Sequence, residues 1–174
     1  ASNALGTINP IKQIIQQAHT KNIPVLIDGA QAAAHLPINV QDLDCDFYVL
    51  SAHKCYGPMG IGLLYGKQKW LDQMPPYQGG GDMSLHVTQD KVTYNELPYK
   101  FEAGTPSVAD AIAWGASIDY LAQLDQAIIK QHESDLYLYA MFKLQEIPEI
   151  KFVGTAKNKI GVISFTLGSI HPHD

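Results

Sequence analysis

Arginine is absent from this sequence, because all 12 basic side chains in the 174 residues are lysines. Arginine binds a carboxylate through two parallel hydrogen bonds, and the ammonium group of lysine does not reproduce that geometry. A site that binds an amino-acid carboxylate in this way therefore needs an arginine from outside this sequence. The formal net charge is −5. Without clustered positive charge, we expect no nucleic-acid partner.

Cysteine is nearly as scarce, and Cys45 and Cys55 form neither a disulfide framework nor a CxxC metal pattern. We interpret both as small packing residues rather than as reactive thiols. The closing His171 and His173 lack the further ligands that a metal site needs. The sequence therefore predicts no metal site and a solvated tail over residues 171–174.

Long apolar runs are also missing. No stretch is long enough to cross a bilayer, and no cationic start precedes a hydrophobic segment. We therefore expect no membrane helix, no signal peptide and a cytoplasmic location. A hydrophobic content of 46% is nevertheless typical of a globular protein with a packed core.

Two short apolar runs end in chemically useful side chains. The run over 25–28 ends at Asp28, and the run over 46–50 passes into Ser-Ala-His-Lys, which ends at Lys54. Such runs are typical of buried strands in a mostly parallel sheet, where ligands bind at the strand ends. Pyridoxal phosphate (PLP) needs an amine to hold its aldehyde and a carboxylate to keep its ring nitrogen protonated. Either residue alone has an ordinary alternative, as a solvated lysine or a turn aspartate; together they are our candidate catalytic pair.

Six motifs follow one another along the chain: Ser2-Asn3-x-Leu5-Gly6-Thr7, Asp28-Gly29-Ala30-Gln31, Asp44-x-Asp46-Phe47, Ser51-x-His53-Lys54, Gly57-Pro58-x-Gly60-x-Gly62 and Phe101-Glu102-x-Gly104-Thr105-Pro106. Together they resemble the class V aminotransferase superfamily, and within it the group II cysteine desulfurases, the type that includes SufS and selenocysteine lyase. The resemblance covers nearly the whole sequence, but only the central fragment of such an enzyme.

The resemblance implies an α/β fold, that of the large domain of a fold-type I PLP-dependent transferase. In this fold a mostly parallel sheet is flanked by helices. Residues 1–124 would form part of the PLP-binding large domain, residues 125–146 a connecting helix, and residues 147–174 the start of the small C-terminal domain.

Helical spacing and end signals add local predictions. Asn9-Pro10 reads as the start of a helix, and His19 near its end is expected to be exposed and to complement the helix dipole. Further helices are expected over 67–74 and 107–124, with Trp114 and Tyr120 packed inside. The segment over 87–94 reads as a strand or ribbon.

The resemblance also implies the roles of further side chains. Asn3 and Gln31 would contact the phenolic oxygen of PLP, and Ser51 and His53 would bind its phosphate. Thr105 of one subunit would contact the phosphate held by the other subunit, which implies a homodimer. On sequence alone, Gln31 is equally compatible with a helix-turn cap, and the segment around Thr105 with a turn before a helix.

The implied function is a cysteine desulfurase, which converts L-cysteine to L-alanine and leaves an enzyme persulfide as a sulfur supply for Fe–S cluster assembly. A sulfur-acceptor protein is then a further possible partner. The persulfide cysteine, the carboxylate-binding arginine and the ring-stacking histidine of such an enzyme are not found here, so we expect this chain to be inactive alone. The alternatives are a selenocysteine lyase or another class V aminotransferase acting on a related substrate, or a non-catalytic folded fragment.

Overall fold

The computed structural model describes residues 1–173. Its central element is a three-stranded sheet of order β1-β2-β3, formed by β1 (Leu26–Asp28), β2 (Phe47–Ser51) and β3 (Gly62–Gly66). β1 and β2 are parallel, whereas β2 and β3 are antiparallel. The expected α/β fold class is confirmed, and within this chain the sheet has one parallel and one antiparallel pairing.

The packed core lies between this sheet and two helices, α1 (Ile11–His19) and α2 (Val40–Leu43). Ile15, Cys45 and Tyr48 are its fully buried members. α1 begins at Ile11, one residue later than the predicted start at Pro10, and its apolar side chains recur at helical spacing, which turns Ile15 towards the sheet. The core therefore supports β1 and β2, the two strands that end in candidate site residues.

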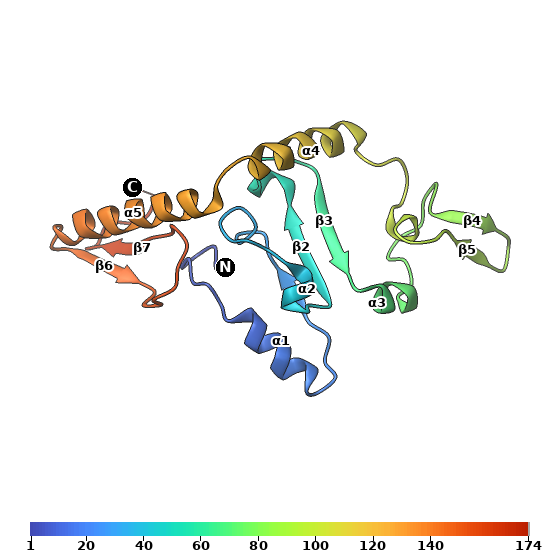
Figure 1. Cartoon of the computed structure of the whole chain (residues 1–174), viewed down its shortest axis with the longest axis horizontal. Helices are drawn as coiled ribbons and strands as arrows, with labels where there is room; N and C mark the ends of the chain where they lie inside the picture. The colour runs from blue at the N-terminus through green and yellow to red at the C-terminus, as the bar shows by residue number, and fades with distance from the viewer. Residues whose placement is uncertain (174) are drawn as a thin grey trace.

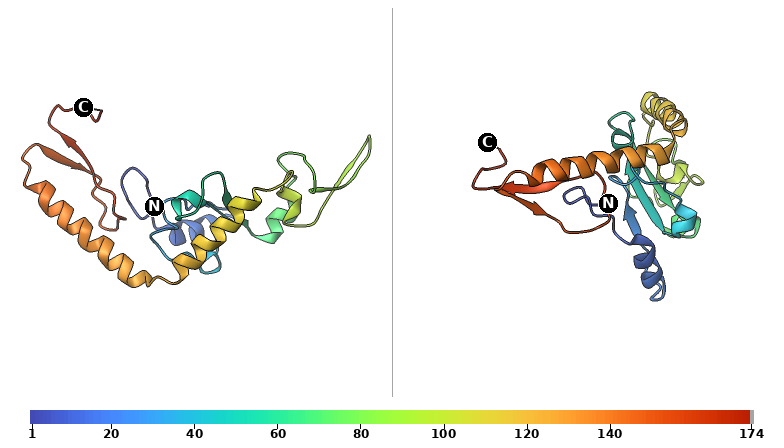
Figure 2. Two further views of the ribbon diagram at one scale, coloured as in Figure 1. Left: turned by 90° about the horizontal axis from the view of Figure 1, so that it is seen from above. Right: turned by 60° about the vertical axis from the view of Figure 1, so that its left-hand side comes forward.

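The rest of the chain extends from this core in two directions (Figure 1). The remaining elements are η1 (Ala52–Lys54), α3 (Gln68–Gln73), β4 (Ser84–Val87), β5 (Val92–Tyr94), η2 (Tyr99–Phe101), α4 (Val108–Ala122), α5 (Gln126–Gln145), β6 (Ile150–Val153) and β7 (Ser164–Leu167). The β4–β5 hairpin projects at one end of the molecule, and the unit formed by α5, β6 and β7 lies at the other (Figures 1 and 2). The predicted helices over 67–74, 107–124 and 125–146 are confirmed as α3, α4 and α5.

The N-terminal segment is held by the C-terminal part of the chain, a contact that the sequence did not predict. The backbone N–H of Ile8 donates to the carbonyl of Asn158 at 3.0 Å, and the N–H of Ile160 donates to the carbonyl of Gly6 at 2.9 Å. Gly6 has a φ of +70°, and a Cβ there would lie 2.9 Å from the Ile160 carbonyl oxygen. Glycine therefore lets the two segments approach closely enough to pair.

Two sequence predictions about packing are wrong. His19 is not a freely solvated helix-end residue, because its Nε2 lies 2.8 Å from Oδ2 of the buried Asp46. Tyr120 is 56% exposed rather than packed, whereas Trp114 is buried as expected. The spacing of apolar residues along α4 shows which of them lie on one face of the helix. It does not show which part of that face packs against another helix or strand.

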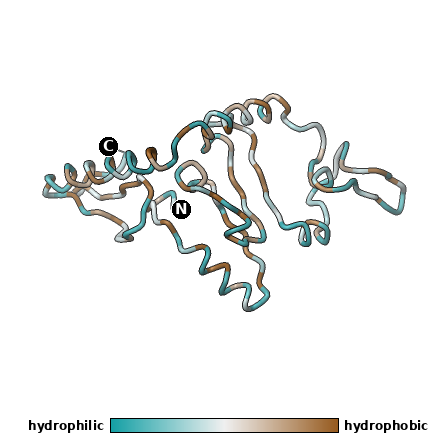
Figure 3. Tube along the Cα trace, viewed as in Figure 1, coloured by the Kyte–Doolittle hydropathy of each residue, from teal (hydrophilic) through white to brown (hydrophobic). Residues whose placement is uncertain are grey.

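Apolar residues recur along β2, β3 and α4 (Figure 3), and the side chains of many remain exposed, such as Ile112 at 71%. The accessible surface of the chain is 12427 Å². A compact monomer of this mass would expose about 8,400 Å². Among the described residues, no helix combines the length and apolarity needed to cross a membrane.

Candidate active site

Asp28 stands at the C-terminal end of β1, at the start of a turn that is tied to β2. The N–H of Gly29 donates to the carbonyl of Val49 at 2.8 Å. Oδ1 of Asp28 accepts from the N–H of Ala30 at 2.9 Å, the local hydrogen bond that aspartate makes in turns. The carboxylate is therefore attached to a fixed backbone, while its second oxygen is available to a ligand.

Tyr48 packs directly beneath this turn. A Cβ placed on Gly29 would lie 2.1 Å from the Tyr48 ring and hydroxyl, so only glycine fits after Asp28. The Tyr48 side chain is 1% exposed, and its hydroxyl has no hydrogen-bond partner among the described residues. Burial, followed by the neighbouring Cys45, Cys55 and Asp28 groups, raises the pKa of Tyr48 to about 12. The phenol therefore remains neutral near pH 7.

Lys54 lies on the single turn η1 that follows β2. The buried Ala52 anchors this turn, since its carbonyl accepts from the N–H of Cys55 at 2.7 Å and from that of Gly57 at 2.9 Å. Trp114 of α4 covers the same turn, and a Cβ on Gly57 would lie 2.8 Å from its ring. The backbone of η1 is thus packed, while the Lys54 side chain itself is exposed.

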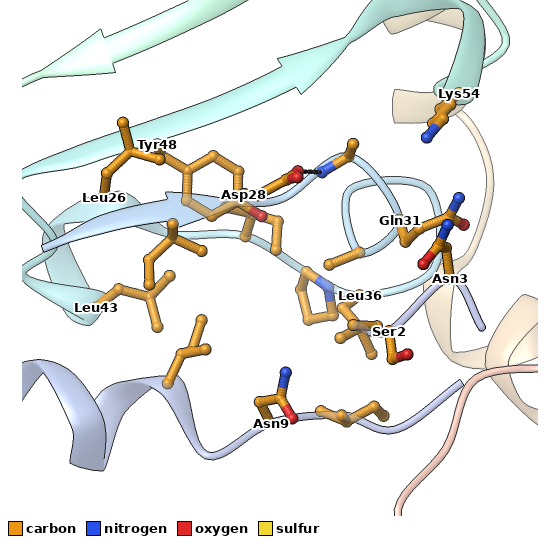
Figure 4. Close-up of a pocket in the computed structure, with 18 residues that line it drawn as sticks. Ser2, Asn3, Asn9, Leu26, Asp28, Gln31, Leu36, Leu43, Tyr48 and Lys54 are labelled. Atoms are coloured by element: carbon orange, nitrogen blue, oxygen red, sulfur yellow. Dashed lines mark hydrogen bonds between the residues drawn. The ribbon is translucent and has the colours of Figure 1, made fainter. Parts of the chain in front are cut away.

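A cavity of about 570 Å³ brings four of the predicted site residues together. It runs along the edge strand β1, with apolar walls that include Ile8, Leu26 and Leu43. Its polar end, at the C-terminal end of β1, is lined by Asn3, Asp28, Gln31 and Lys54 (Figure 4). A volume of about 300 to 1,000 Å³ with apolar walls and a few polar groups is typical of small-molecule sites.

Three predicted site residues do not line this cavity. Ser51 is the last residue of β2, and His53 is exposed in η1, immediately before Lys54. Both residues are therefore near Lys54 in the sequence. Thr105 is exposed before α4. The glycine-rich segment over 79–81 packs against the residues before Thr105, where the N–H of Gly104 donates to the carbonyl of Gly81 at 3.0 Å.

Cys45 and Cys55 are both buried, which confirms their interpretation as packing residues. Burial raises the pKa of each thiol. A protonated, enclosed thiol is a poor nucleophile. Neither cysteine is suited to attack a substrate from this cavity.

Sequence reasoning missed the charged cluster around Asp46 at the opposite end of β2. This buried carboxylate accepts from the N–H of Val25 at 2.8 Å and from Nε1 of Trp70 at 2.7 Å, in addition to its contact with His19. Burial acts to raise its pKa, but hydrogen bonds from Trp70, His19 and Val25 together with the charge of Lys67 outweigh it and lower the pKa to about 2. The sequence signal that could have revealed this cluster is a charged residue inside an apolar run, because a buried charge needs partners. The cluster fixes the starts of both strands and lies outside the cavity.

A family comparison decides the classification. The model of the family described as "Aminotransferase class-V" matches residues 1–174. The chain belongs to the class-V aminotransferase family. This membership agrees with the fold and with the motif order along the chain.

Individual relatives carry more specific names. A protein of Serratia proteamaculans named cysteine desulfurase is 49% identical over 99% of this chain. The crystal structure of the cysteine desulfurase CsdA from Escherichia coli superposes with a TM-score of 0.91 at 39% identity, also over 99% of this chain. A C-DES mutant with glycine covalently linked to its PLP cofactor shares the fold, with a TM-score of 0.81 at 23% identity over 95% of this chain. The chain spans only 43% of the Serratia protein, 43% of the CsdA chain and 45% of the C-DES chain.

The residues around the cavity fit a PLP-type cofactor. An amine and a carboxylate reach one cavity from paired parallel strands, and amide side chains lie beside them. The buried Tyr48 hydroxyl, which lies against Gly29 after Asp28, is a donor without a partner among residues 1–173. An unpaired buried donor is unusual in folded proteins and often marks a functional position.

Proposed function

We propose that this chain is the central part of a PLP-dependent cysteine desulfurase, with Asp28 and Lys54 as its catalytic pair. The observation that carries the proposal is that these two side chains line one cavity, Asp28 from the end of β1 and Lys54 from the turn after β2. The cysteine desulfurases at 49% and 39% identity support it. Both relatives match 99% of this chain, and each is more than twice as long as the chain.

Each catalytic group has a defined task in this proposal. Bound PLP supplies an electron-withdrawing ring that stabilises negative charge on the α-carbon of L-cysteine. The Asp28 carboxylate holds a proton on the ring nitrogen, because a negative charge beside that nitrogen favours its cationic form. The Lys54 amine would hold the cofactor aldehyde, and its Nζ would move protons to and from the substrate α-carbon.

The polar neighbours would orient the cofactor. Asn3 and Gln31, which line the polar end of the cavity, supply amide N–H groups to the phenolic oxygen. Ser51 and His53 flank the lysine turn, and their hydroxyl and imidazole N–H groups are suitable donors to the phosphate. We also infer that Thr105 serves the cofactor of a second subunit, as the family resemblance implies; it is exposed before α4 and lies outside the lining of the cavity of its own chain. The functional unit is then a homodimer.

The proposal requires groups that this chain does not contain. An arginine for the substrate carboxylate is absent, and the two cysteines are buried. We therefore place the sulfur-accepting thiolate outside residues 1–174. The complete enzyme would leave alanine and a persulfide, and would pass the sulfur to an acceptor protein for Fe–S cluster assembly in the cytoplasm. The isolated chain is expected to bind the cofactor without desulfurase turnover.

An absorbance titration with PLP tests this function. The wild-type chain is compared with Lys54→Ala and with Lys69→Ala, which removes an exposed lysine of α3. We expect saturable visible absorbance in the wild type and in Lys69→Ala, and its loss in Lys54→Ala with the far-UV circular dichroism spectrum unchanged. Equal absorbance in all three chains would mean that PLP reacts with surface lysines, and would refute the proposed site.

A further inference from the structure

The Tyr48 hydroxyl is a buried hydrogen-bond donor whose position calls for a partner. The ring fills the core between the sheet and α1, yet the hydroxyl has no hydrogen-bond partner among residues 1–173. A buried polar group without a partner destabilises the folded chain. Phenylalanine would fill the same core volume without that cost, so the packing of the core does not account for the hydroxyl.

The surroundings of the hydroxyl point to Asp28. In the parallel pairing, Tyr48 lies opposite Ile27 and projects from the same face of the sheet, and its ring extends to the turn that follows Asp28. Its hydroxyl lies against Gly29, one residue after Asp28, where a Cβ would come within 2.1 Å of it. Both side chains line the cavity, and Figure 4 shows the Tyr48 ring beside the Asp28 side chain.

The Asp28 carboxylate has an oxygen to accept this donor. Oδ1 is bound by the N–H of Ala30, and Asp28 is exposed, so rotation of its side chain is not prevented by packing. The neighbouring thiols of Cys45 and Cys55 are weak acceptors. An ionised carboxylate is the strongest acceptor next to Tyr48.

We propose that Tyr48 is a positioning residue, whose hydroxyl donates to the Asp28 carboxylate when this carboxylate turns towards the ring nitrogen of the cofactor. This inference rests on the proposed function. The cofactor-loaded site then satisfies a donor that has no partner among residues 1–173 of the free chain. Tyr48 acts through Asp28 and does not itself contact the substrate.

Tyr48→Phe separates this role from a structural one, because it keeps the ring that packs on Gly29 and removes only the hydroxyl. The free variant is expected to be at least as stable as the wild type in thermal unfolding. Its dissociation constant for PLP, measured by visible absorbance, is expected to rise about threefold to tenfold, as for the loss of one hydrogen bond. Tyr77→Phe is the matched control, since Tyr77 is 99% exposed, and should change neither quantity.

A double-mutant cycle with Asp28→Ala tests whether the hydroxyl acts through the carboxylate. Lys54 still holds the cofactor in that background, and Tyr48→Phe should weaken PLP binding no further there. An equal loss of affinity with and without the carboxylate would overturn the inference. So would an unchanged affinity of the single variant, or a lower stability of its free form.

Borohydride labelling of Lys54, combined with the Tyr48→Phe binding measurement, distinguishes a failure of this inference from a failure of the proposed function. A wild-type chain that is labelled at Lys54 after borohydride reduction, together with an unaffected Tyr48→Phe variant, refutes the role of Tyr48 alone. A wild-type chain without label at Lys54 refutes the proposed function and the role of Tyr48 together.

Discussion

Asp46 links single residues to the stability of the whole sheet. Asp46 is 1% exposed and immediately precedes β2, and its carboxylate joins α1, through His19, to Val25 immediately before β1. Its folded-state pKa of about 2 lies below the ordinary value of 3.8. A carboxylate with a lowered pKa contributes stability above about pH 4, and that contribution is lost as the pH falls towards 2.

Replacing Asp46 with asparagine is expected to lower the free energy of unfolding at pH 7 by about 2 to 3 kcal/mol. The amide NH₂ of asparagine is a donor, and it would replace a carboxylate oxygen that accepts hydrogen bonds from Trp70, Val25 or His19. The difference from the wild type should shrink as the pH falls from about 4 towards 2, because first the unfolded and then the folded wild-type carboxylate becomes protonated. Urea unfolding at pH 7 and pH 3 measures both effects. Asp42→Asn, at an exposed pair with Lys12, should change little, and a similar loss in both variants would contradict this account.

Gly29 offers a second test, of the packing beneath Asp28. Alanine would place its Cβ 2.1 Å from the Tyr48 ring, and the ring could relieve this clash only by leaving its packed position in the core. We expect Gly29→Ala to destabilise the chain by about 2 kcal/mol or more. Gly115→Ala in α4 meets no atom within 4 Å and should stabilise the helix by about 0.5 to 1 kcal/mol. Thermal unfolding of both variants gives the comparison, and a stabilised Gly29→Ala variant would show that the turn is loosely packed.

The sequence predicted that Asp28 and Lys54 share a site, and both line one cavity; the rule that ligands bind at strand ends needs only local information. It did not identify Tyr48, since an aromatic residue inside an apolar run looks like core until its hydroxyl is found without a partner. The contact between His19 and Asp46 joins residues 27 positions apart. Periodicity along one helix does not encode such a contact.

At the scale of elements, the boundary between α4 and α5 follows from one capping residue. The Asp125 side chain accepts from the N–H groups of Ala127 and Ile128 at the start of α5. Such a side chain satisfies donors that have no partner within the helix. The predicted start of this helix, at residue 125, lies within one residue of the observed start at Gln126.

Asp125→Ala should therefore loosen the first turn of α5. We expect a loss of about 1 kcal/mol of stability, together with faster amide hydrogen exchange over the first turn of the helix. Asp135→Ala, in the middle of the same helix, removes only an exposed bond from Gln131 and serves as the control. Unchanged exchange in Asp125→Ala would mean that tertiary packing, and not the cap, fixes this helix start.

The segment over 87–94 shows a limit of pattern analysis. It was expected to form a strand or ribbon, and it forms part of the β4–β5 hairpin, which begins earlier, at Ser84. The register between the two strands shifts between Ser84 and His86. Such an irregularity disturbs the alternation from which strand ends are predicted.

At the scale of the whole molecule, the exposed surface is larger than that of a compact protein. The chain exposes 12427 Å², against about 8,400 Å² expected for its mass. Exposed apolar side chains on β3 and α4, including Leu63, Leu64 and Ile112, contribute to this excess. Surfaces of this kind are covered by other protein segments or by partners in most soluble proteins.

We therefore expect the isolated chain to self-associate. Sedimentation equilibrium should give a mean mass above 19.1 kDa that rises with concentration. Replacing Ile112 with glutamine, a similar side chain with a polar end, should weaken the association without changing the circular dichroism spectrum. A clean monomer at all concentrations would contradict this expectation.

The sequence predicted the fold class and the family because the motif order extends over the whole chain. The division into a large domain, a connecting helix and the start of a small domain remains a prediction. The pairing of residues near Gly6 with residues near Ile160 adds a contact between the first and last parts of the chain. Motif order does not specify such long-range pairing, because the two segments are brought together only by the folded chain between them.

The central claim is that Lys54 is the lysine that holds the cofactor. The most direct measurement is borohydride reduction of the PLP-treated chain, followed by mass-spectrometric peptide mapping of the labelled lysine. The account predicts one predominant label at Lys54, with little at the remaining lysines. A label spread over surface lysines, or none at Lys54, would contradict it.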